Sequence, residues 1–304
     1  MPATLQAFIA IFFLGALLRS SGLLKKTHAE RLASIVFSIS LPATILVSLD
    51  RVAFSPTAWK LPLAACLVST SMLLCSWPLT RLLRLPRATR GGFLLGIGCI
   101  NSVYFAYPVV LATLGDEGLA QAILFDLGQS TLTLTVIYGL AVWHGDKSST
   151  PRSALTRFVS SPPLWALCLS FLLTLLGVHL PAWVRETLIP IHLTTTPLAS
   201  LVLGLSISFS AVRRTWALAL LGVGLRMMGG LFLGAAAAYF LDLTGLERAI
   251  VIFVAAMPSA VTAVIFASDT GLDEDLVTSI VTLSICVGVA LLPWLPQLAL
   301  FLLR

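Results

Sequence analysis

The chain has 304 residues, of which 58% are hydrophobic and only 11% are charged. An ordinary soluble domain carries about a quarter charged residues, so this composition excludes a conventional soluble domain and a disordered chain. The formal net charge of +6 would favour a nucleic-acid partner for a soluble protein. Here, however, apolar stretches of about 20 residues recur along the chain, each long enough to cross a bilayer core of about 30 Å. We therefore predict an all-α polytopic membrane protein and expect no nucleic-acid partner.

The first apolar stretch is predicted to be a membrane helix and not a secretory signal. It has no basic n-region, and its positive charge, Arg19, follows the apolar run. Nine further stretches follow it. The ten predicted spans are about 3–18, 32–49, 61–80, 91–114, 118–143, 163–180, 194–211, 215–241, 249–268 and 276–302. An even number of spans places both termini on one side of the membrane.

The distribution of basic residues predicts which side that is. Most of the 19 Lys and Arg residues lie between spans 1 and 2, 3 and 4, 5 and 6, or 7 and 8. Because Lys and Arg are retained in the cytoplasm, both termini are predicted to face the outer, periplasmic side. The acidic connection before the last span is an exception, and we expect its carboxylates to cap the N-terminus of that helix, with a gate or ion-entry role as the weaker alternative. Its acidic residues are Asp269, Asp273, Glu274 and Asp275.

The longest polar connection divides the spans into two groups of five. An odd number of helices in each half makes the second half run upside down relative to the first, which is the arithmetic of an inverted repeat. Leu41-Pro42-Ala43 in the second span recurs as Pro197-Leu198-Ala199 in the seventh. We predict a single membrane domain, residues 1–304, made of a repeat at about 1–143, a cytoplasmic connection at about 144–162 and a repeat at about 163–304.

The fourth and ninth spans each carry a proline near the middle, Pro108 and Pro258. Proline lacks an N–H and clashes with the carbonyl one turn earlier, so each helix is predicted to be kinked or broken there. The second half of each helix would direct its N-terminus toward the break, and two helix N-termini favour an anion. Ordinary proline kinks that affect only packing are the alternative. The N–H groups expected to face the breaks are those of Val109, Val110, Ser259 and Ala260.

Two ionisable residues, Asp126 and Arg226, are placed deep in the membrane. Asp126 lies roughly 12 Å from the outer end of its span and Arg226 roughly 18 Å from the inner end of its own, so their depths coincide in a core of about 30 Å. An uncompensated charge there costs at least about 2.5–3.5 kcal/mol. We expect Arg226 to hold an anionic substrate or Asp126 to carry a coupling proton, with a static ion pair between them as the alternative. Gln129 and Ser130 share a helical face with Asp126 and make it polar.

Several kinds of chemistry are not expected. The five cysteines and four histidines are dispersed, so neither a disulfide framework nor a metal site is predicted. The sequence has no GxxxxGK[ST] loop for ATP, and no metalloprotease motif, paired intramembrane Asp motif or nucleophile elbow. No catalytic residue and no cofactor is therefore predicted.

The order and spacing of several motifs resemble the auxin efflux carrier family, whose bacterial members include presumed malonate and malate permeases. The resemblance covers nearly the whole chain, from an opening helix with a basic turn to a Thr/Ser-rich last helix. The motifs are Leu41-Pro42, Asn101 seven residues before Pro108, Leu114-Gly115-Asp116-Glu117-Gly118-Leu119, Asp126-Leu127-Gly128, Met257-Pro258-Ser259-Ala260 and Leu292-Pro293.

The resemblance implies a scaffold of spans 1, 2, 6 and 7 and a transport unit of spans 3–5 and 8–10. Within that unit, spans 4 and 9 would cross at their prolines, bind substrate there and move by an elevator-like alternation; a homodimer is also implied. The crossing residues would be Asn101, Pro108, Pro258 and Ser259. Val103 and Ala106 replace the usual glycines beside Tyr104 and Tyr107, so a bulkier cavity wall is expected. The long cytoplasmic loop of the plant hormone carriers is missing, so auxin itself is not implied.

Together these features predict a secondary transporter, or permease, of the cell inner membrane that moves a small organic anion without nucleotide. The anion is expected to be a mono- or dicarboxylate. Proton coupling, sodium coupling and uniport stay open, and an intramembrane enzyme or a non-transporting sensor is the alternative. The predicted substrate-binding residues are Asn101, Tyr104, Tyr107, Pro108, Met257, Pro258, Ser259 and Arg226. The predicted coupling or ion site consists of Asp126, Gln129 and Ser130.

Overall fold

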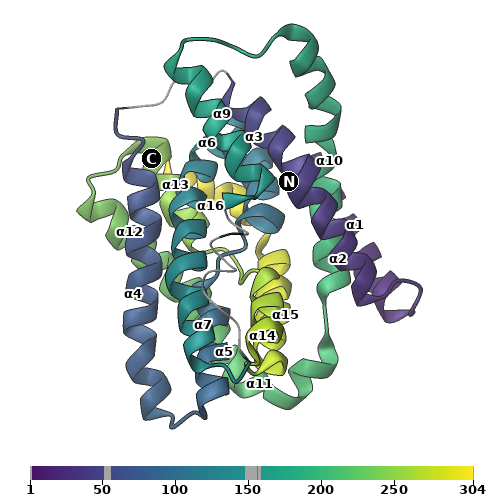
Figure 1. The fold of residues 1–304 in the computed structure, drawn as a ribbon, viewed down its shortest axis with the longest axis vertical. Coiled ribbons are helices and arrows are strands. Elements are labelled where there is room, and N and C mark those ends of the chain that lie inside the picture. Colours follow the sequence, from purple (N-terminus) through teal and green to yellow (C-terminus); the bar gives the residue numbers. More distant parts are fainter. Residues whose placement is uncertain (1, 51–55, 148–155, 157–158, 304) are drawn as a thin grey trace. The chain divides into compact units, whose positions relative to one another are not determined.

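The computed structural model describes residues 2–50, 56–147, 156 and 159–303 (Figure 1). Within these residues the regular elements are all helical, which confirms the predicted all-α class. Seven helices of the described chain are long and apolar enough to cross a membrane. They are Ala3–Ser20, Thr27–Leu49, Lys60–Leu82, Ser102–His144, Ala182–Ser206, Phe209–Phe240 and Glu274–Leu291.

The remaining predicted spans are shorter or interrupted helices. The predicted span 163–180 is α9 (Pro162–Leu175), the fourth begins with α5 (Arg87–Gly98), and the ninth is divided into α13 (Gly245–Ala255) and α14 (Thr262–Thr270). The boundary between the fourth and fifth spans lies inside α6 (Tyr107–Leu132), which bends at Gly115, where φ is 69°. Glycine adopts this left-handed conformation without the steric cost that other residues incur.

The predicted start of the seventh span was wrong. The seventh span begins at Ala182 and not near residue 194, because α10 (Ala182–Ser206) continues through two internal prolines and several polar residues. With a helix start near residue 194, Arg185 and Glu186 would lie in a loop before the helix. In the structure these residues lie in the first turns of α10.

The contacts between residues divide the chain into two compact units. Unit 1 comprises residues 1–56, 103–123 and 156–207, and unit 2 comprises residues 57–102, 124–155 and 208–304. The chain therefore changes unit after Ser102 and again within α6.

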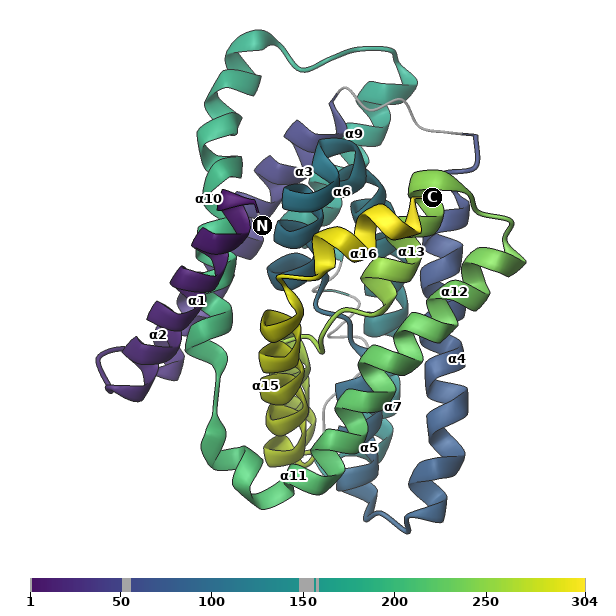
Figure 2. The same ribbon diagram turned by 180° about the vertical axis from the view of Figure 1, so that it is seen from behind.

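Unit 1 is built around the pairing of α1 with α10. The first part of α6 and the elements α1 (Ala3–Ser20), α2 (Lys26–Ile35), the π-helix η1 (Val36–Ser40), α3 (Leu41–Leu49), α9 and α10 belong to it. Helices α1 and α10 lie against each other in both ribbon views (Figures 1 and 2). A Cβ atom on Gly15 would lie 2.8 Å from the Leu201 carbonyl oxygen, so this pairing requires glycine at the contact. The hydroxyls of Thr44 and Thr195, 2.8 Å apart, join α3 to α10.

Unit 2 has α5 and α13 at its centre. It also contains α4 (Lys60–Leu82), the π-helix η3 (Thr133–Ile137), α7 (Tyr138–His144), α11 (Phe209–Gly224), the π-helix η4 (Leu225–Gly229), α12 (Gly230–Phe240), α14, α15 (Glu274–Leu291) and α16 (Leu295–Leu302). Helix α12 lies beside α4 and α13 (Figures 1 and 2), and α5 packs against α4, α7 and α15. Residues 91–98 of α5 and 249–255 of α13 are all buried. Both helices end inside this core.

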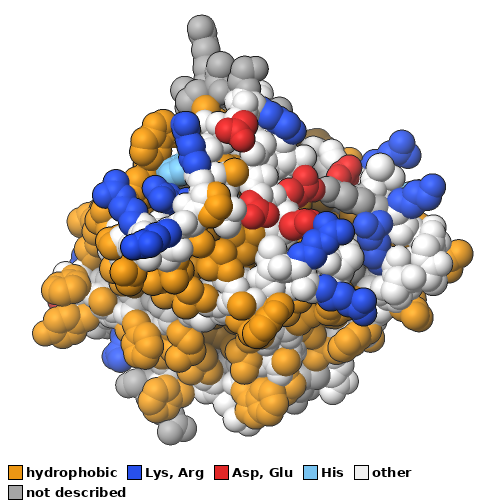
Figure 3. Space-filling view, turned by 90° about the horizontal axis from the view of Figure 1, so that it is seen from below, with side chains coloured by type: hydrophobic (Ala, Val, Ile, Leu, Met, Phe, Trp, Pro, Cys, Tyr) orange, Lys and Arg blue, Asp and Glu red, His pale blue; other side chains and the backbone are white. Residues whose placement is uncertain are grey.

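The surface of the described residues fits a lipid environment. Large hydrophobic side chains are exposed on several helices, for example Phe13, Leu17, Phe232 and Phe240. Six tryptophans are also exposed, most of them near helix ends, as in the aromatic belts of membrane proteins. These are Trp59, Trp143, Trp165, Trp183, Trp216 and Trp294. Figure 3 shows a face on which Lys, Arg, Asp and Glu side chains gather beside hydrophobic ones.

The acidic connection before α15 forms the predicted cap. The Asp273 carboxylate accepts a hydrogen bond from the Leu276 N–H at 3.1 Å, and Glu274 and Asp275 occupy the first turn. Negative charge stabilises a helix N-terminus, so the absence of basic residues in this connection has a structural reason.

Candidate functional site

Two interrupted helices meet inside unit 2. Helix α5 ends at Gly98 and α13 ends at Ala255, and the segments that follow contact each other in an antiparallel bridge between Ile100 and Ser259. The Asn101 N–H donates to the Pro258 carbonyl oxygen at 2.9 Å, and the Ala260 N–H donates to the Cys99 carbonyl oxygen at 3.0 Å. This contact, which we call the crossing (residues 99–102 and 256–261), gives partners to backbone groups that no helix satisfies at membrane depth.

The sequence predicted the first break at Pro108. In the structure the break lies earlier in the chain, at residues 99–101. Pro108 lies in the first turn of α6, after the π-helix η2 (Ser102–Ala106). The helical stretch from Ser102 to His144 continues through this proline. Pro258, by contrast, lies within the second break as predicted.

The N–H groups expected to face an anion at the second break already have protein partners. The Ser259 N–H donates to the Ser284 hydroxyl at 3.0 Å, and the Ala260 N–H is bound to Cys99. The Ser259 hydroxyl donates to the Gly96 carbonyl oxygen. Ser259 therefore joins the ends of the two broken helices to α15.

Arg226 lies between the C-terminal ends of α5 and α13. It is fully buried, with 0% of its surface exposed, and it belongs to the π-helix η4 that separates α11 from α12. Its Nη1 donates to the Ile97 carbonyl oxygen at 2.8 Å, and its Nη2 donates to the Ala255 carbonyl oxygen. Each helix C-terminus carries about half a negative charge, so the two together roughly balance the guanidinium.

The static ion pair between Arg226 and Asp126, which the sequence left as an alternative, is not among the salt bridges of the described residues. Within the described residues, the hydrogen bonds of the guanidinium go to backbone carbonyls, and no salt bridge joins it to Asp126. Asp126 is half-buried on α6, where it accepts a hydrogen bond from the Ser130 hydroxyl at 3.3 Å. Equal depth in the membrane was the basis of this alternative, but depth does not determine the direction in which a side chain points from its helix.

Gln129 supports the crossing directly. Its Nε2 donates to the Gly98 carbonyl oxygen at 3.0 Å and to the Thr133 hydroxyl at 3.1 Å, while its Oε1 accepts from the Ser69 hydroxyl. The polar stripe of α6 that includes Gln129 was visible in the sequence. Its attachment to the end of α5 was not, because the break after Gly98 was placed elsewhere.

The remaining predicted substrate contacts fall into both units. Met257 is buried in the second break, in unit 2. Tyr104, Tyr107 and Pro108 belong to unit 1, where the Tyr104 hydroxyl donates to the Ala33 carbonyl oxygen at 3.1 Å. Contact of these residues with a substrate stays a prediction.

Three buried polar atoms have no hydrogen-bond partner among the described residues: Asn101 Oδ1 and Ser102 Oγ in the crossing, and Nε of Arg226, which binds the adjoining helix ends. Their residues are 1%, 3% and 0% exposed, and Asn101 Nδ2 is held by the Ser259 carbonyl oxygen at 3.2 Å. Buried polar groups are nearly always hydrogen-bonded, and leaving one unpaired costs about 1–3 kcal/mol. An acceptor, a hydroxyl and a charged donor are thus available to a polar ligand. This makes the crossing the candidate binding site.

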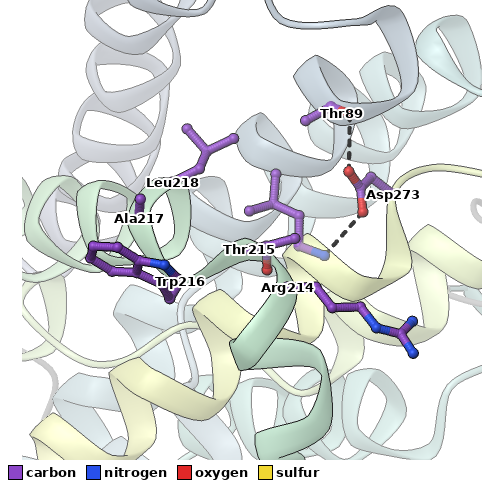
Figure 4. Close-up of a pocket in the computed structure, with 8 residues that line it drawn as sticks. Thr89, Arg214, Thr215, Trp216, Ala217, Leu218 and Asp273 are labelled. Atoms are coloured by element: carbon purple, nitrogen blue, oxygen red, sulfur yellow. Dashed lines mark hydrogen bonds between the residues drawn. The ribbon is translucent and has the colours of Figure 1, made fainter.

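A separate pocket of about 280 Å³ opens in unit 2 where α11 leaves helical geometry at Thr215 (Figure 4). The carboxylate that lines this pocket, Asp273, already accepts hydrogen bonds from the Thr89 hydroxyl at 2.9 Å and from the Leu276 N–H at the start of α15. Arg214 points away from Asp273 in Figure 4 and pairs with Asp275 at 2.9 Å. Its charged groups therefore already have partners, and we assign no ligand to this pocket.

Comparison with known proteins places nearly the whole chain among transporters. A family model described as "Membrane transport protein" matches residues 3–295, a range that includes both breaks and Arg226. An uncharacterized transporter of Methanothermobacter thermautotrophicus is 30% identical over 293 residues, which are 95% of each chain. An uncharacterized transporter of Methanocaldococcus jannaschii is 28% identical over 274 residues, 85% of each chain.

Proposed function

The chain belongs to the auxin efflux carrier family of membrane transport proteins, and from this premise we propose that it is a secondary transporter of a small organic anion. The substrate is a mono- or dicarboxylate, which crosses the inner membrane by elevator-like alternating access without nucleotide. Both termini face the periplasm, in accord with the distribution of basic residues along the sequence.

The observation that carries the proposal is the set of unpartnered buried atoms at the crossing. The Ser102 hydroxyl and the Arg226 Nε–H are donors suited to a carboxylate oxygen. Asn101 Oδ1 is an acceptor and suits the hydroxyl of a hydroxy acid or a protonated second carboxyl group. A hydroxy acid or a partly protonated dicarboxylate carries a partner for each of these kinds of group, whereas a hydrocarbon or a cation carries no acceptor for the two donors.

The division into two units supports the elevator-like mechanism. All three atoms belong to unit 2, and Arg226, Gln129 and Ser259 hold the broken helices of that unit together. A site built within one unit can travel with that unit as a body, while the other unit stays in place. Domain movement of this kind requires no rearrangement of the site itself.

The test is uptake of labelled carboxylates by purified protein in liposomes, after a thermal-shift screen has selected the best ligand. We expect Ser102→Ala to lower uptake about tenfold or more, because it removes a hydrogen bond to the charged carboxylate, worth about 1.5–3 kcal/mol. Asn101→Ala removes a hydrogen bond to a neutral group of the ligand, worth about 0.5–1.5 kcal/mol, and should lower uptake about two- to tenfold. Ser20→Ala, at an exposed hydroxyl on α1, is the matched control and should transport normally.

The same experiment separates the competing classes of function. A sensor would bind a carboxylate without moving it, and an enzyme would convert it to a product that chromatography detects. If no carboxylate stabilises the protein or enters the liposomes, the proposed function fails.

A further inference from the structure

The two breaks expose a cluster of backbone carbonyls at the C-terminal ends of α5 and α13. Helix ends leave their last carbonyls without intrahelical partners. Here Gly96 binds Ser259, Gly98 binds Gln129, and Ile97 and Ala255 bind Arg226. In transporters with broken helices, carbonyls at half-helix C-termini are the groups that coordinate sodium ions or protons. These two helix ends therefore have the chemistry of a cation site, and a side chain of the protein fills it.

We propose that the guanidinium of Arg226 is a tethered cation, which occupies the carbonyl site formed by Ile97 and Ala255 and holds the two broken helices together. The charge balance favours this reading, because two helix C-termini together supply about one negative charge and Arg226 supplies one positive charge. Arg226 is a positioning residue in this role. It fixes the ends of α5 and α13, from which the Asn101 and Ser259 segments continue.

The local backbone is adapted to bring the guanidinium to this place. Arg226 lies in a single-turn π-helix, a feature that changes the direction of side chains and is frequent at functional sites. One turn later, a Cβ on Gly230 would collide with the Ala255 carbonyl oxygen and would lie 2.6 Å from Arg226 Nη2. A Cβ on the neighbouring Gly229 would meet only Met72, at 3.4 Å. Glycine is thus required on the side of the helix that faces the carbonyl site.

A cation that is covalently attached cannot leave during a transport cycle. If the protein transports as proposed above, sodium is not needed at the carbonyl site, and any coupling cation binds at another residue. The occupancy of the carbonyl site by Arg226 does not itself depend on transport. It can therefore be tested on purified protein without a substrate.

The test is chemical rescue of an Arg226→Ala protein by free cations. Thermal unfolding of wild type, Arg226→Ala and Arg214→Ala is measured in detergent with about 20 mM guanidinium, methylguanidinium, sodium or choline chloride at constant ionic strength. We expect Arg226→Ala to unfold roughly 5 °C or more below wild type. Guanidinium, methylguanidinium or sodium should restore much of that loss, and the restoring effect should saturate as the cation concentration rises. Choline, which is too large for the site, should restore nothing. Wild type and Arg214→Ala, which loses an exposed arginine, should respond to no cation specifically.

The proposal is overturned if Arg226→Ala is as stable as wild type, if no cation restores it, or if all three proteins respond alike. Should Arg226→Ala fail to fold, Arg226→Lys and Arg226→Met decide between charge and packing. A hydrophobic residue of similar size is often as good as a buried charge where the charge has no special role. We expect Arg226→Lys to unfold at a higher temperature than Arg226→Met; equal temperatures, or the reverse order, contradict a tethered cation.

Discussion

The glycine pair that follows Arg226 offers a matched test of the crossing. Gly229 and Gly230 are neighbours in sequence, yet only Gly230 faces the Ala255 carbonyl oxygen and the Arg226 guanidinium. Gly230→Ala should push the end of α13 away from Arg226. Gly229→Ala adds the same methyl group beside Met72, where the contact is an ordinary one.

The two substitutions should differ in their effect on stability. At Gly230 the overpacking costs about 1–3 kcal/mol and the weakened hydrogen bond from the guanidinium to Ala255 about 1.5–3 kcal/mol. These two effects involve the same atoms and do not simply add, so we expect a loss of about 2–4 kcal/mol. At Gly229 the higher helix propensity of alanine should stabilise the protein by about 0.5–1 kcal/mol, or leave it unchanged.

The assay is unfolding of each purified variant in mixed micelles by titration with a denaturing detergent, followed by circular dichroism. The difference in unfolding free energy between the two alanine variants is the quantity of interest. Equal stability of the two variants would refute the close approach of α12 to the end of α13. Loss of stability in both would instead indicate a general need for glycine in this segment.

Substitutions at three further residues test separate parts of the structure. Asp126→Asn should leave the fold intact but remove any dependence of uptake on the proton gradient, as measured in liposomes with and without that gradient; a retained dependence excludes Asp126 as the coupling residue. Gln129→Leu should lower the unfolding free energy by about 1–3 kcal/mol, because the Gly98 carbonyl oxygen loses its partner in a buried site; a stability equal to that of wild type in the same detergent titration speaks against this support of α5. Asp273→Ala should cost about 0.5–2 kcal/mol through loss of the cap on Leu276, whereas Asp273→Asn should keep most of it, and identical midpoints in thermal unfolding would contradict the cap.

The class of protein could be read from the sequence because it depends on composition and length. Apolar runs of about 20 residues indicate membrane helices whatever their neighbours are. The cap by Asp273 could also be predicted, since a carboxylate and a helix start lie close together in sequence. Both features are local, and both are present in the structure.

The position of the first break could not be predicted in the same way. A proline shows where a helix lacks a backbone N–H donor. The interruption after Gly98 depends instead on which distant residues this segment contacts in the folded protein. Asn101 donates to the carbonyl of Pro258, a residue far away in sequence, and this contact replaces the helical hydrogen bond. The sequence therefore indicated that the two helices are interrupted, while their meeting point required tertiary structure.

The role of Arg226 shows the same limit. Its depth in the membrane and its need for compensation followed from the sequence, and Asp126 was the charged residue at a matching depth. The structure supplies the compensation from the backbone instead, through the carbonyl oxygens of Ile97 and Ala255. Carbonyls at helix ends do not stand out in a sequence, because every residue has one.

The central claim is that a carboxylate binds at the crossing, and equilibrium binding tests it most directly. The dissociation constant of the best carboxylate is measured by isothermal titration calorimetry with wild type, Ser102→Ala and Ser20→Ala. We expect Ser102→Ala to weaken binding about tenfold or more and Ser20→Ala to bind as wild type does. Equal dissociation constants for all three proteins would contradict the claim and place the binding site elsewhere.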